Sequence, residues 1–282
     1  MVPPGGVSRS SPAFCVFEVI IIEQQFHRIA VKIGTSSLVL PNGQMNLPTI
    51  DRLAYVLSAL NHQGYEVLLI SSGAIGVGLE TVGLTTRPKA IAEQQALAAI
   101  GQAALMRIYS QRFLDYQTHI AQLLLTRDVF DYQQSRKNTM NTINCLLADR
   151  VVPIINENDP ISIDEPDHHT TFSDNDELSA IVTKNAAVNL LIVLSDIDAF
   201  YDRDPHRYPD AQPIRRVTEI TPELKAAASG ASSAVGTGGM VTKLHAAMTV
   251  MAAGKQMVLC NGRDPKVIFD VLAGKPVGTH FG

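Results

Sequence analysis

The chain has 282 residues, of which 46% are hydrophobic and 18% charged, so it is long and apolar enough to bury a core and to exclude disorder as its default state. Its net charge of −4 excludes the basic face that non-specific nucleic-acid binding requires. No uncharged apolar run approaches a membrane span, and three scattered cysteines exclude a disulfide scaffold, which favours a reducing, cytoplasmic compartment.

The first 26 residues differ in composition from the rest. They are rich in Pro, Gly and Ser, and Glu18 interrupts their apolar patch, Ala13–Ile22, which argues against a signal peptide. We therefore expect residues 1–26 to be a disordered tail without a catalytic role and residues 27–282 to form one domain.

From residue 28 onward, continuous apolar segments alternate with segments of helical periodicity. The expected strands are 28–33, 65–70, 119–125, 151–155, 189–194 and 256–260. The expected helices are 48–62, about 88–116, 133–149, 176–187, one from about 240, and 265–273. The segments 156–175 and 202–236 are expected as loops. This alternation predicts an α/β fold with a mostly parallel central sheet covered by helices on both faces.

Small or polar residues follow four of these strands, where the chain leaves the sheet. They are Gly34–Ser37, Ser71–Ala74, Asn156–Asp159 and Ser195–Asp198. Because ligands of open α/β sheets bind at the carboxyl ends of the strands, we expect one cleft there. Scattered polar turns are the alternative.

A glycine-rich segment precedes the helix expected from about residue 240. Gly236, Gly238 and Gly239 come just before it, and Lys243 lies in its first turn. The free N–H groups of a helix start attract anions, and glycine lets a phosphate approach closely, so the pattern predicts a phosphate-binding loop. A plain glycine turn with a surface lysine is the alternative.

Two further charged residues stand out. Lys32 interrupts an apolar strand next to Gly34, so it either points towards an anion or guards an edge strand. The run Asp174–Glu177 holds more acidic groups than one helix cap needs. We therefore expect Asp176 to pair with Lys32 or Lys243.

Other motifs do not support simple alternatives. Gly254 and Lys255 are followed by Gln256, which excludes a Walker A loop, and no Gly-x-Ser-x-Gly elbow surrounds Ser72. The adjacent His168 and His169 are expected in a solvated loop and not as metal ligands.

Taken in order, these segments resemble the amino-acid kinase family and, within it, the members that phosphorylate glutamate. The matching segments are Val31–Ser36, Ser71–Ile75, Asn156–Asp159, Asp174–Ala180 and Gly236–Lys243. The resemblance implies a three-layer αβα sandwich and ATP-dependent phosphorylation of the γ-carboxylate of L-glutamate, the first step of proline biosynthesis. It also implies Mg²⁺, a homo-oligomer and feedback inhibition by proline. A glutamyl phosphate reductase is a candidate partner, and the sequence does not say whether it takes the product directly.

The resemblance assigns roles to individual residues. The catalytic residues would be Lys32, Lys243 and Asp176. The substrate-binding residues would be Ser72, Gly73, Asp159 and Asn175. The nucleotide-binding residues would be Lys32, Gly34, Ser195, Asp196, Thr237, Gly238, Gly239, Met240 and Lys243. No protein ligand of the metal is expected, since phosphate oxygens and water would hold Mg²⁺.

The sequence departs from the family pattern at three places. Ser173 and Ala199 stand where glycine is common, and the chain ends at Gly282 without the C-terminal PUA domain of many bacterial members.

Two other functions remain open. One is a family member with another acceptor, such as acetylglutamate, aspartate, carbamate or a nucleoside monophosphate. The other is a non-catalytic amino-acid sensor, against which the presence of both lysines and Asp176 argues.

Overall fold

The computed structural model describes residues 26–162, 164–165, 168–169, 172, 174–205, 207–230 and 239–282. All but the last residue of the expected tail, as well as Ser173, Thr237 and Gly238, lie outside the described residues.

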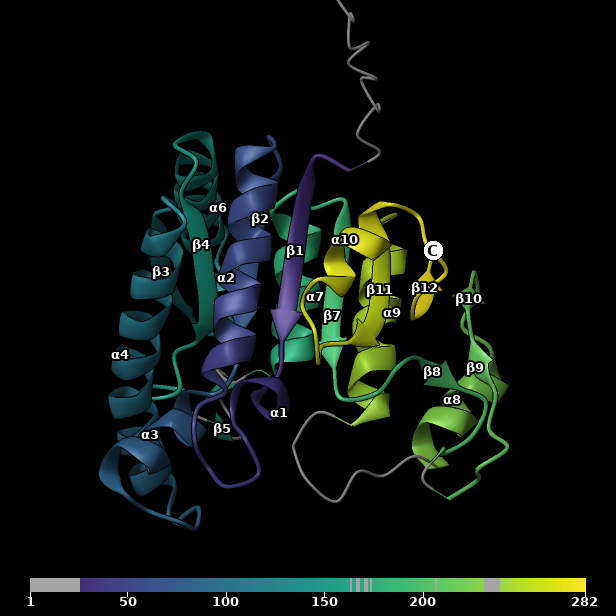
Figure 1. Ribbon diagram of the computed structural model, residues 1–282, viewed down its shortest axis with the longest axis horizontal. Coiled ribbons are helices and arrows are strands. Elements are labelled where there is room, and N and C mark those ends of the chain that lie inside the picture. The colour runs from purple at the N-terminus through teal and green to yellow at the C-terminus, as the bar shows by residue number, and fades with distance from the viewer. Residues whose placement is uncertain are drawn as a thin grey trace, which may run out of the picture.

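An eight-stranded sheet forms the middle layer of the molecule (Figure 1). Its order is β10-β12-β11-β7-β1-β2-β4-β3, and all neighbouring pairs are parallel except β11 and β12. The strands are β1 (Arg28–Ile33), β2 (Glu66–Ser71), β3 (Ile120–Leu125), β4 (Val152–Glu157), β7 (Leu190–Ser195), β10 (Arg216–Val217), β11 (Gln256–Asn261) and β12 (Thr279–Phe281). The predicted mostly parallel α/β sheet is therefore confirmed.

Helices cover both faces of this sheet. On the near face in Figure 1 lie α2 (Leu47–His62), α4 (Ile91–Asp115) and α10 (Val267–Leu272). On the far face lie α6 (Gln133–Ala148), α7 (Asn175–Asn185) and α9 (Met240–Ala252), while α8 (Pro222–Gly230) packs against α9. Alternate residues of each central strand point into the two hydrophobic cores, which explains why these strands are apolar without a break.

Several elements differ from the prediction. The strand expected to end at residue 155 continues through Asn156 and Glu157, because their backbones still pair with β3. The segment expected as a loop at 156–175 contains β5 (Asp164–Glu165) and β6 (His168–His169), so the two histidines lie on a short strand. The segment 202–236 contains β9 (Pro213–Ile214), which pairs with β8 (Phe200–Tyr201), as well as β10 and α8.

Helix α3 (Ala74–Val82) was also missed by the sequence analysis, because its glycines obscure the helical pattern. Those glycines have a packing reason. A Cβ built on Gly78 would lie 2.1 Å from the Leu97 carbonyl oxygen, and one built on Gly101 would lie 1.8 Å from that of Ala74. Helices α3 and α4 therefore touch backbone to backbone.

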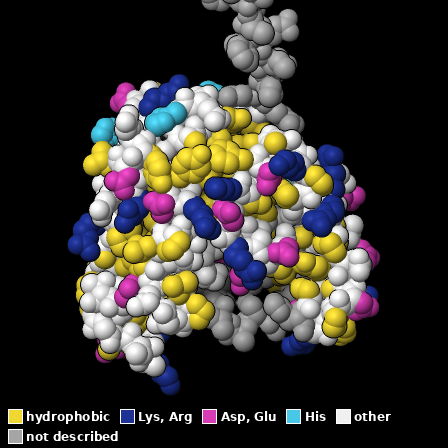
Figure 2. Space-filling view, viewed as in Figure 1, with side chains coloured by type: hydrophobic (Ala, Val, Ile, Leu, Met, Phe, Trp, Pro, Cys, Tyr) yellow, Lys and Arg dark blue, Asp and Glu magenta, His cyan; other side chains and the backbone are white. Residues whose placement is uncertain are grey.

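The face shown in Figure 2 carries Lys and Arg side chains interspersed with Asp and Glu among hydrophobic ones, and its described part lacks a large patch of one sign. This distribution agrees with the small net charge. None of the described helices is both long and apolar enough to cross a membrane.

Candidate active site

The carboxyl ends of β1, β2, β4, β7 and β11 meet at one edge of the sheet, at the bottom of Figure 1. Because these strands are parallel, the polar segments that follow them are brought together as the sequence predicts. Helices α1 (Thr35–Leu38), α3 and α9 begin at this edge, so their free N–H groups point towards it.

Lys32, Asp176 and Lys243 form a buried cluster at this edge. Lys32 Nζ lies 2.6 Å from Asp176 Oδ1, and Lys243 Nζ lies 3.2 Å from Asp176 Oδ2. Asp176 is 0% exposed, and the two lysines are 7% and 6% exposed. The predicted pairing is confirmed with both lysines at once. Since β1 lies between β2 and β7, the edge-strand explanation of Lys32 is wrong.

The surroundings of Asp176 keep it ionised. Burial alone would raise the pKa of this carboxyl. The two lysines and a hydrogen bond from Thr242 Oγ1 at 3.0 Å outweigh burial, so the pKa lies below its usual value. A carboxylate held in this way orients two ammonium groups and is a poor proton acceptor. The cluster as a whole carries a net positive charge, which suits a phosphoryl group.

Two glycines leave the neighbouring space open. A Cβ on Gly34 would lie 3.7 Å from Lys32 Nζ, so glycine leaves out a side chain that would touch the ammonium group. Gly239 caps α9, and Met240 is its first residue, one turn before Lys243. The start of α9 therefore lies beside the lysines, as a phosphate-binding helix start would.

A chain of amide side chains leads from this cluster towards α4. Asn175, next to Asp176, donates from Nδ2 to Ser72 Oγ at 2.7 Å and to Asn156 Oδ1 at 3.0 Å. Asn156 in turn donates to Gln102 Oε1 at 2.9 Å. The buried Oδ1 of Asn175 accepts no hydrogen bond from the described residues, so it remains available to a ligand donor.

Two members of this chain, Gln102 and Asn156, were not singled out individually by the sequence analysis. Gln102 was counted as part of a helical pattern, although a buried amide on an apolar helix face is itself a signal. Gly73, which caps α3, has φ of 101°, and this conformation places Ser72 at the sharp turn after β2.

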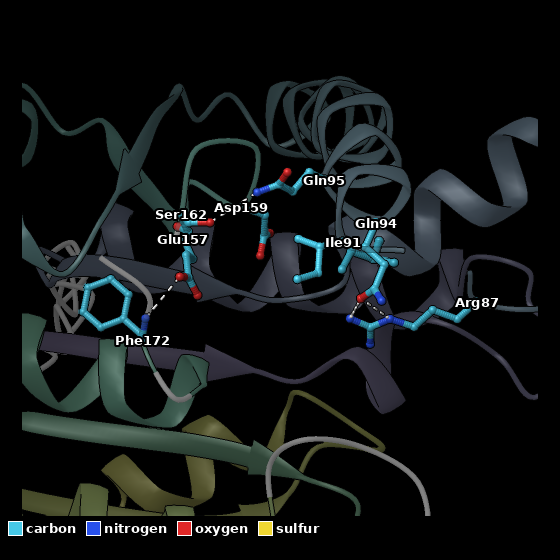
Figure 3. Close-up of a pocket in the computed structure, with 9 residues that line it drawn as sticks. Arg87, Ile91, Gln94, Gln95, Glu157, Asp159, Ser162 and Phe172 are labelled. Carbon is cyan, nitrogen blue, oxygen red and sulfur yellow. Dashed lines mark hydrogen bonds between the residues drawn. The ribbon is translucent and has the colours of Figure 1, made fainter. Parts of the chain in front are cut away.

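A cavity of about 220 Å³ is lined by residues of α4 and by Glu157, which follows Asn156 at the end of β4 (Figure 3). Its wall is formed by Ile75, Arg87, Ile91, Gln94, Gln95, Glu157, Asp159, Ser162 and Phe172. Asp159, which was expected to bind substrate, lines this cavity. Arg87, in the connection between α3 and α4, and Gln94, near the start of α4, were not anticipated.

The two acids of this cavity are unusual in their ionisation. Burial raises the pKa of Glu157 to about 7, and the nearby carboxylates of Asp159 and Glu177 add to this effect, while the Phe172 N–H opposes it. Burial also raises the pKa of Asp159, and Arg87 lowers it. Both carboxylates would therefore be stabilised by a cationic ligand.

Ser195 and Asp196 lie at the end of β7, between β1 and β11 in the sheet order. Ser195 is buried and donates from Oγ to Asp196 Oδ1 at 3.1 Å, while Asp196 is exposed. Ala199, one of the departures from the family pattern, is fully buried before β8. These residues border the strand that carries Lys32, on the side away from the cavity of Figure 3.

Comparison with known proteins places the chain in a family. The amino acid kinase family matches residues 27–261. Proteins named glutamate 5-kinase from Lactiplantibacillus plantarum and Lactococcus lactis subsp. lactis are each 54% identical, over 93% and 90% of this chain and 99% and 94% of their own.

Solved structures show the same fold at low sequence identity. An isopentenyl phosphate kinase of T. acidophilum has a TM-score of 0.61 at 15% identity, covering 90% of this chain and 99% of its own. A carbamate kinase of Giardia lamblia has a TM-score of 0.64 at 15% identity, covering 91% and 98%. The chain belongs to the amino acid kinase family.

Proposed function

We propose that the chain transfers the terminal phosphoryl group of ATP to the γ-carboxylate of L-glutamate and forms L-glutamyl 5-phosphate, the first step of proline biosynthesis. The observation that carries the proposal is the buried cluster of Lys32, Asp176 and Lys243 at the carboxyl edge of the sheet. The name of the relatives, glutamate 5-kinase, supports the choice of acceptor.

The chemistry requires charge and position more than a base. A glutamate carboxylate has a pKa near 4.3 in water, so it is already ionised at pH 7. One of its oxygens attacks the terminal phosphorus, the bond to the bridging oxygen of ADP breaks, and no proton is transferred. The obstacle is the repulsion between two anions, which Lys32 and Lys243 offset as charge builds on the phosphoryl oxygens.

The remaining residues would hold the two substrates on either side of this cluster. Ser72, Gly73, Asn175 and Asp159 would bind glutamate, because the cavity and the amide chain lie on that side. Nucleotide binding would involve the other side, which begins at the ends of β1 and β7. Its residues would be Lys32, Gly34, Ser195, Asp196 and Thr237–Lys243.

Mg²⁺ fits this site as an ion that the phosphates of the nucleotide would hold. Among the described residues, no three His, Cys, Asp or Glu side chains group as a metal cage, and Asp176 is already neutralised by two lysines. Mg²⁺ commonly keeps its waters and binds phosphate oxygens, where it would offset part of their charge.

The acceptor is tested by ADP release with a panel of compounds. We expect L-glutamate to exceed acetylglutamate, aspartate, carbamate and a nucleoside monophosphate by at least about 100-fold in kcat/KM. Preference for another acceptor would overturn the glutamate assignment. Binding of glutamate without ADP release would indicate a sensor.

The role of the cluster is tested by Lys243→Ala. Removing one charge that stabilises the transition state typically costs on the order of 100- to 1000-fold in kcat. Lys137→Ala, on the exposed side of α6, is the matched control and should keep full activity. A folded Lys243→Ala protein with unchanged kcat would contradict the assignment.

The same proposal covers the setting of the enzyme. We propose a cytoplasmic homo-oligomer that proline inhibits and that hands its labile product to a glutamyl phosphate reductase. Sedimentation of the purified chain tests whether it forms a homo-oligomer. ADP release with added proline tests whether proline inhibits it.

A further inference from the structure

The cavity of Figure 3 carries opposite charges on opposite sides. Glu157 and Asp159 lie on one side, at and beyond the end of β4, and Arg87 lies on the other, before α4. Ile75 and Ile91 contribute apolar surface to the same wall. A small zwitterion with an aliphatic stem is the kind of ligand that matches this pattern.

The acidic side of the cavity holds two carboxylates whose ionised forms a positively charged ligand group would stabilise. Both acids are partly exposed, and both have raised pKa values because burial of their carboxyl groups disfavours the ionised forms. Glu157 accepts a hydrogen bond from the Phe172 N–H at 3.1 Å, which fixes its position but adds no positive charge. An ammonium group between the two acids would remove the cost of their ionisation.

The basic side is held in place by its neighbour. Arg87 donates from Nε and Nη2 to Gln94 Oε1 at 3.0 and 2.6 Å, and Gln94 Nε2 donates to the Pro88 carbonyl at 3.0 Å. These contacts tie the guanidinium to α4 and occupy two of its five N–H groups. The others can bind a carboxylate, which a planar guanidinium recognises well.

We propose that Arg87 binds the α-carboxylate of the amino-acid substrate and that Glu157, together with Asp159, binds its α-ammonium group. The inference rests on the proposed function, since it concerns the same substrate. The stem of the ligand then runs past the isoleucines, and the proposed function requires its far end to reach the lysines. Arg87 and Glu157 thereby select a free amino acid over an acylated or decarboxylated one.

The experiment compares L-glutamate with L-glutamic acid α-amide, which keeps the γ-carboxylate and the ammonium group but lacks the α-carboxylate. With Arg87→Gln, we expect KM for L-glutamate to rise at least tenfold while kcat changes less than threefold. For the α-amide, kcat/KM, or its inhibition constant where turnover is slow, should be the same in wild type and variant. Lys89→Gln, two residues along and exposed, should behave as wild type.

Each other outcome overturns one specific statement. An unchanged KM for L-glutamate in Arg87→Gln, or an equal loss for both ligands, would overturn the role of Arg87. A matching test uses Glu157→Gln with glutarate, which lacks the ammonium group and should be unaffected, whereas L-glutamate should lose affinity. If the wild-type chain releases no ADP with glutamate, the proposed function fails, and the same comparison by ligand-induced thermal shift still decides the binding roles.

Discussion

The two ends of the proposed substrate site differ in how their charges are balanced. At the lysine end, one carboxylate lies between two ammonium groups, and all three side chains are buried and paired. At the cavity end, two acids with raised pKa values face one arginine. The first arrangement is complete within the chain, whereas we propose that a ligand completes the second. A preorganised reaction centre beside a ligand-dependent recognition site follows from this difference.

The largest expected effect is a loss of stability when the ion pairs at the lysine end are removed. Asp176→Asn leaves two buried ammonium groups facing each other without a counter-charge, which should cost about 3–5 kcal/mol in the free energy of unfolding. Urea denaturation measures this loss. The control is Asp115→Asn, which removes an exposed ion pair with Arg112 and should change the free energy by less than about 1 kcal/mol. Equal losses in both variants would show that burial of the cluster contributes nothing.

A smaller loss is expected where α3 meets α4, the support of Arg87. Gly101→Ala would place a methyl group 1.8 Å from the Ala74 carbonyl oxygen and force the helices apart. We expect thermal denaturation to show a loss of about 1–3 kcal/mol, with a raised KM for glutamate. Gly76→Ala is the control, because its Cβ would meet side chains and no backbone, with Val39 Cγ2 at 3.1 Å and Thr35 Cγ2 at 3.5 Å. A variant at position 101 as stable as the one at position 76 would contradict close backbone packing.

The amide chain that links the two ends should give an effect confined to substrate affinity. Gln102→Leu leaves Asn156 without its buried acceptor, so Asn175 loses its fixed orientation. We expect KM for glutamate to rise about tenfold, equivalent to about 1.4 kcal/mol, with a smaller change in kcat. Gln102→Glu keeps an acceptor oxygen and should restore most of the affinity. Equal KM values in the two variants would show that orientation by Gln102 is unimportant.

The smallest expected effect is a pH dependence that distinguishes the ends. The pKa of Glu157 rises from its usual 4.5 in the unfolded chain to about 7 in the folded one. Its contribution to stability is therefore fully present below pH 4.5 and is lost as the pH rises through about 7. Glutamate affinity should change in the opposite direction, because the ionised carboxylate attracts the ammonium group.

Glu157→Gln tests whether the pH dependence comes from Glu157 or from the charged groups near it, which are Asp159, Glu177 and Arg87. The variant should show a flatter dependence of both the urea midpoint and KM between pH 5 and pH 8. Unchanged slopes would assign the pH dependence to another group.

Much of the architecture could be predicted because the central strands are buried on both faces. The apolar run of β7 has no polar interruption before Ser195, and that of β1 has only Lys32. The exception was informative, since a lysine inside a central strand requires a partner. Asp176 could be found in the same way, as an acid in excess of what the α7 cap needs.

The rest depended on contacts that local sequence does not encode. Gln102 and Asn156 are 54 positions apart, and their hydrogen bond exists only once α4 lies over β4. Two-residue strands such as β8 and β9 have no periodicity to detect. Arg87 lies in an exposed connection, where an arginine has no distinctive pattern.

The burial of Lys32 and Lys243 has a consequence for behaviour in salt. Mobile ions screen charges that water reaches, over about 10 Å at 0.1 M, but act far less on groups enclosed by protein. These ammonium groups are almost enclosed, whereas Arg87 is exposed. Raising the ionic strength should therefore weaken the capture of the amino acid well before it disturbs the phosphoryl-transfer step.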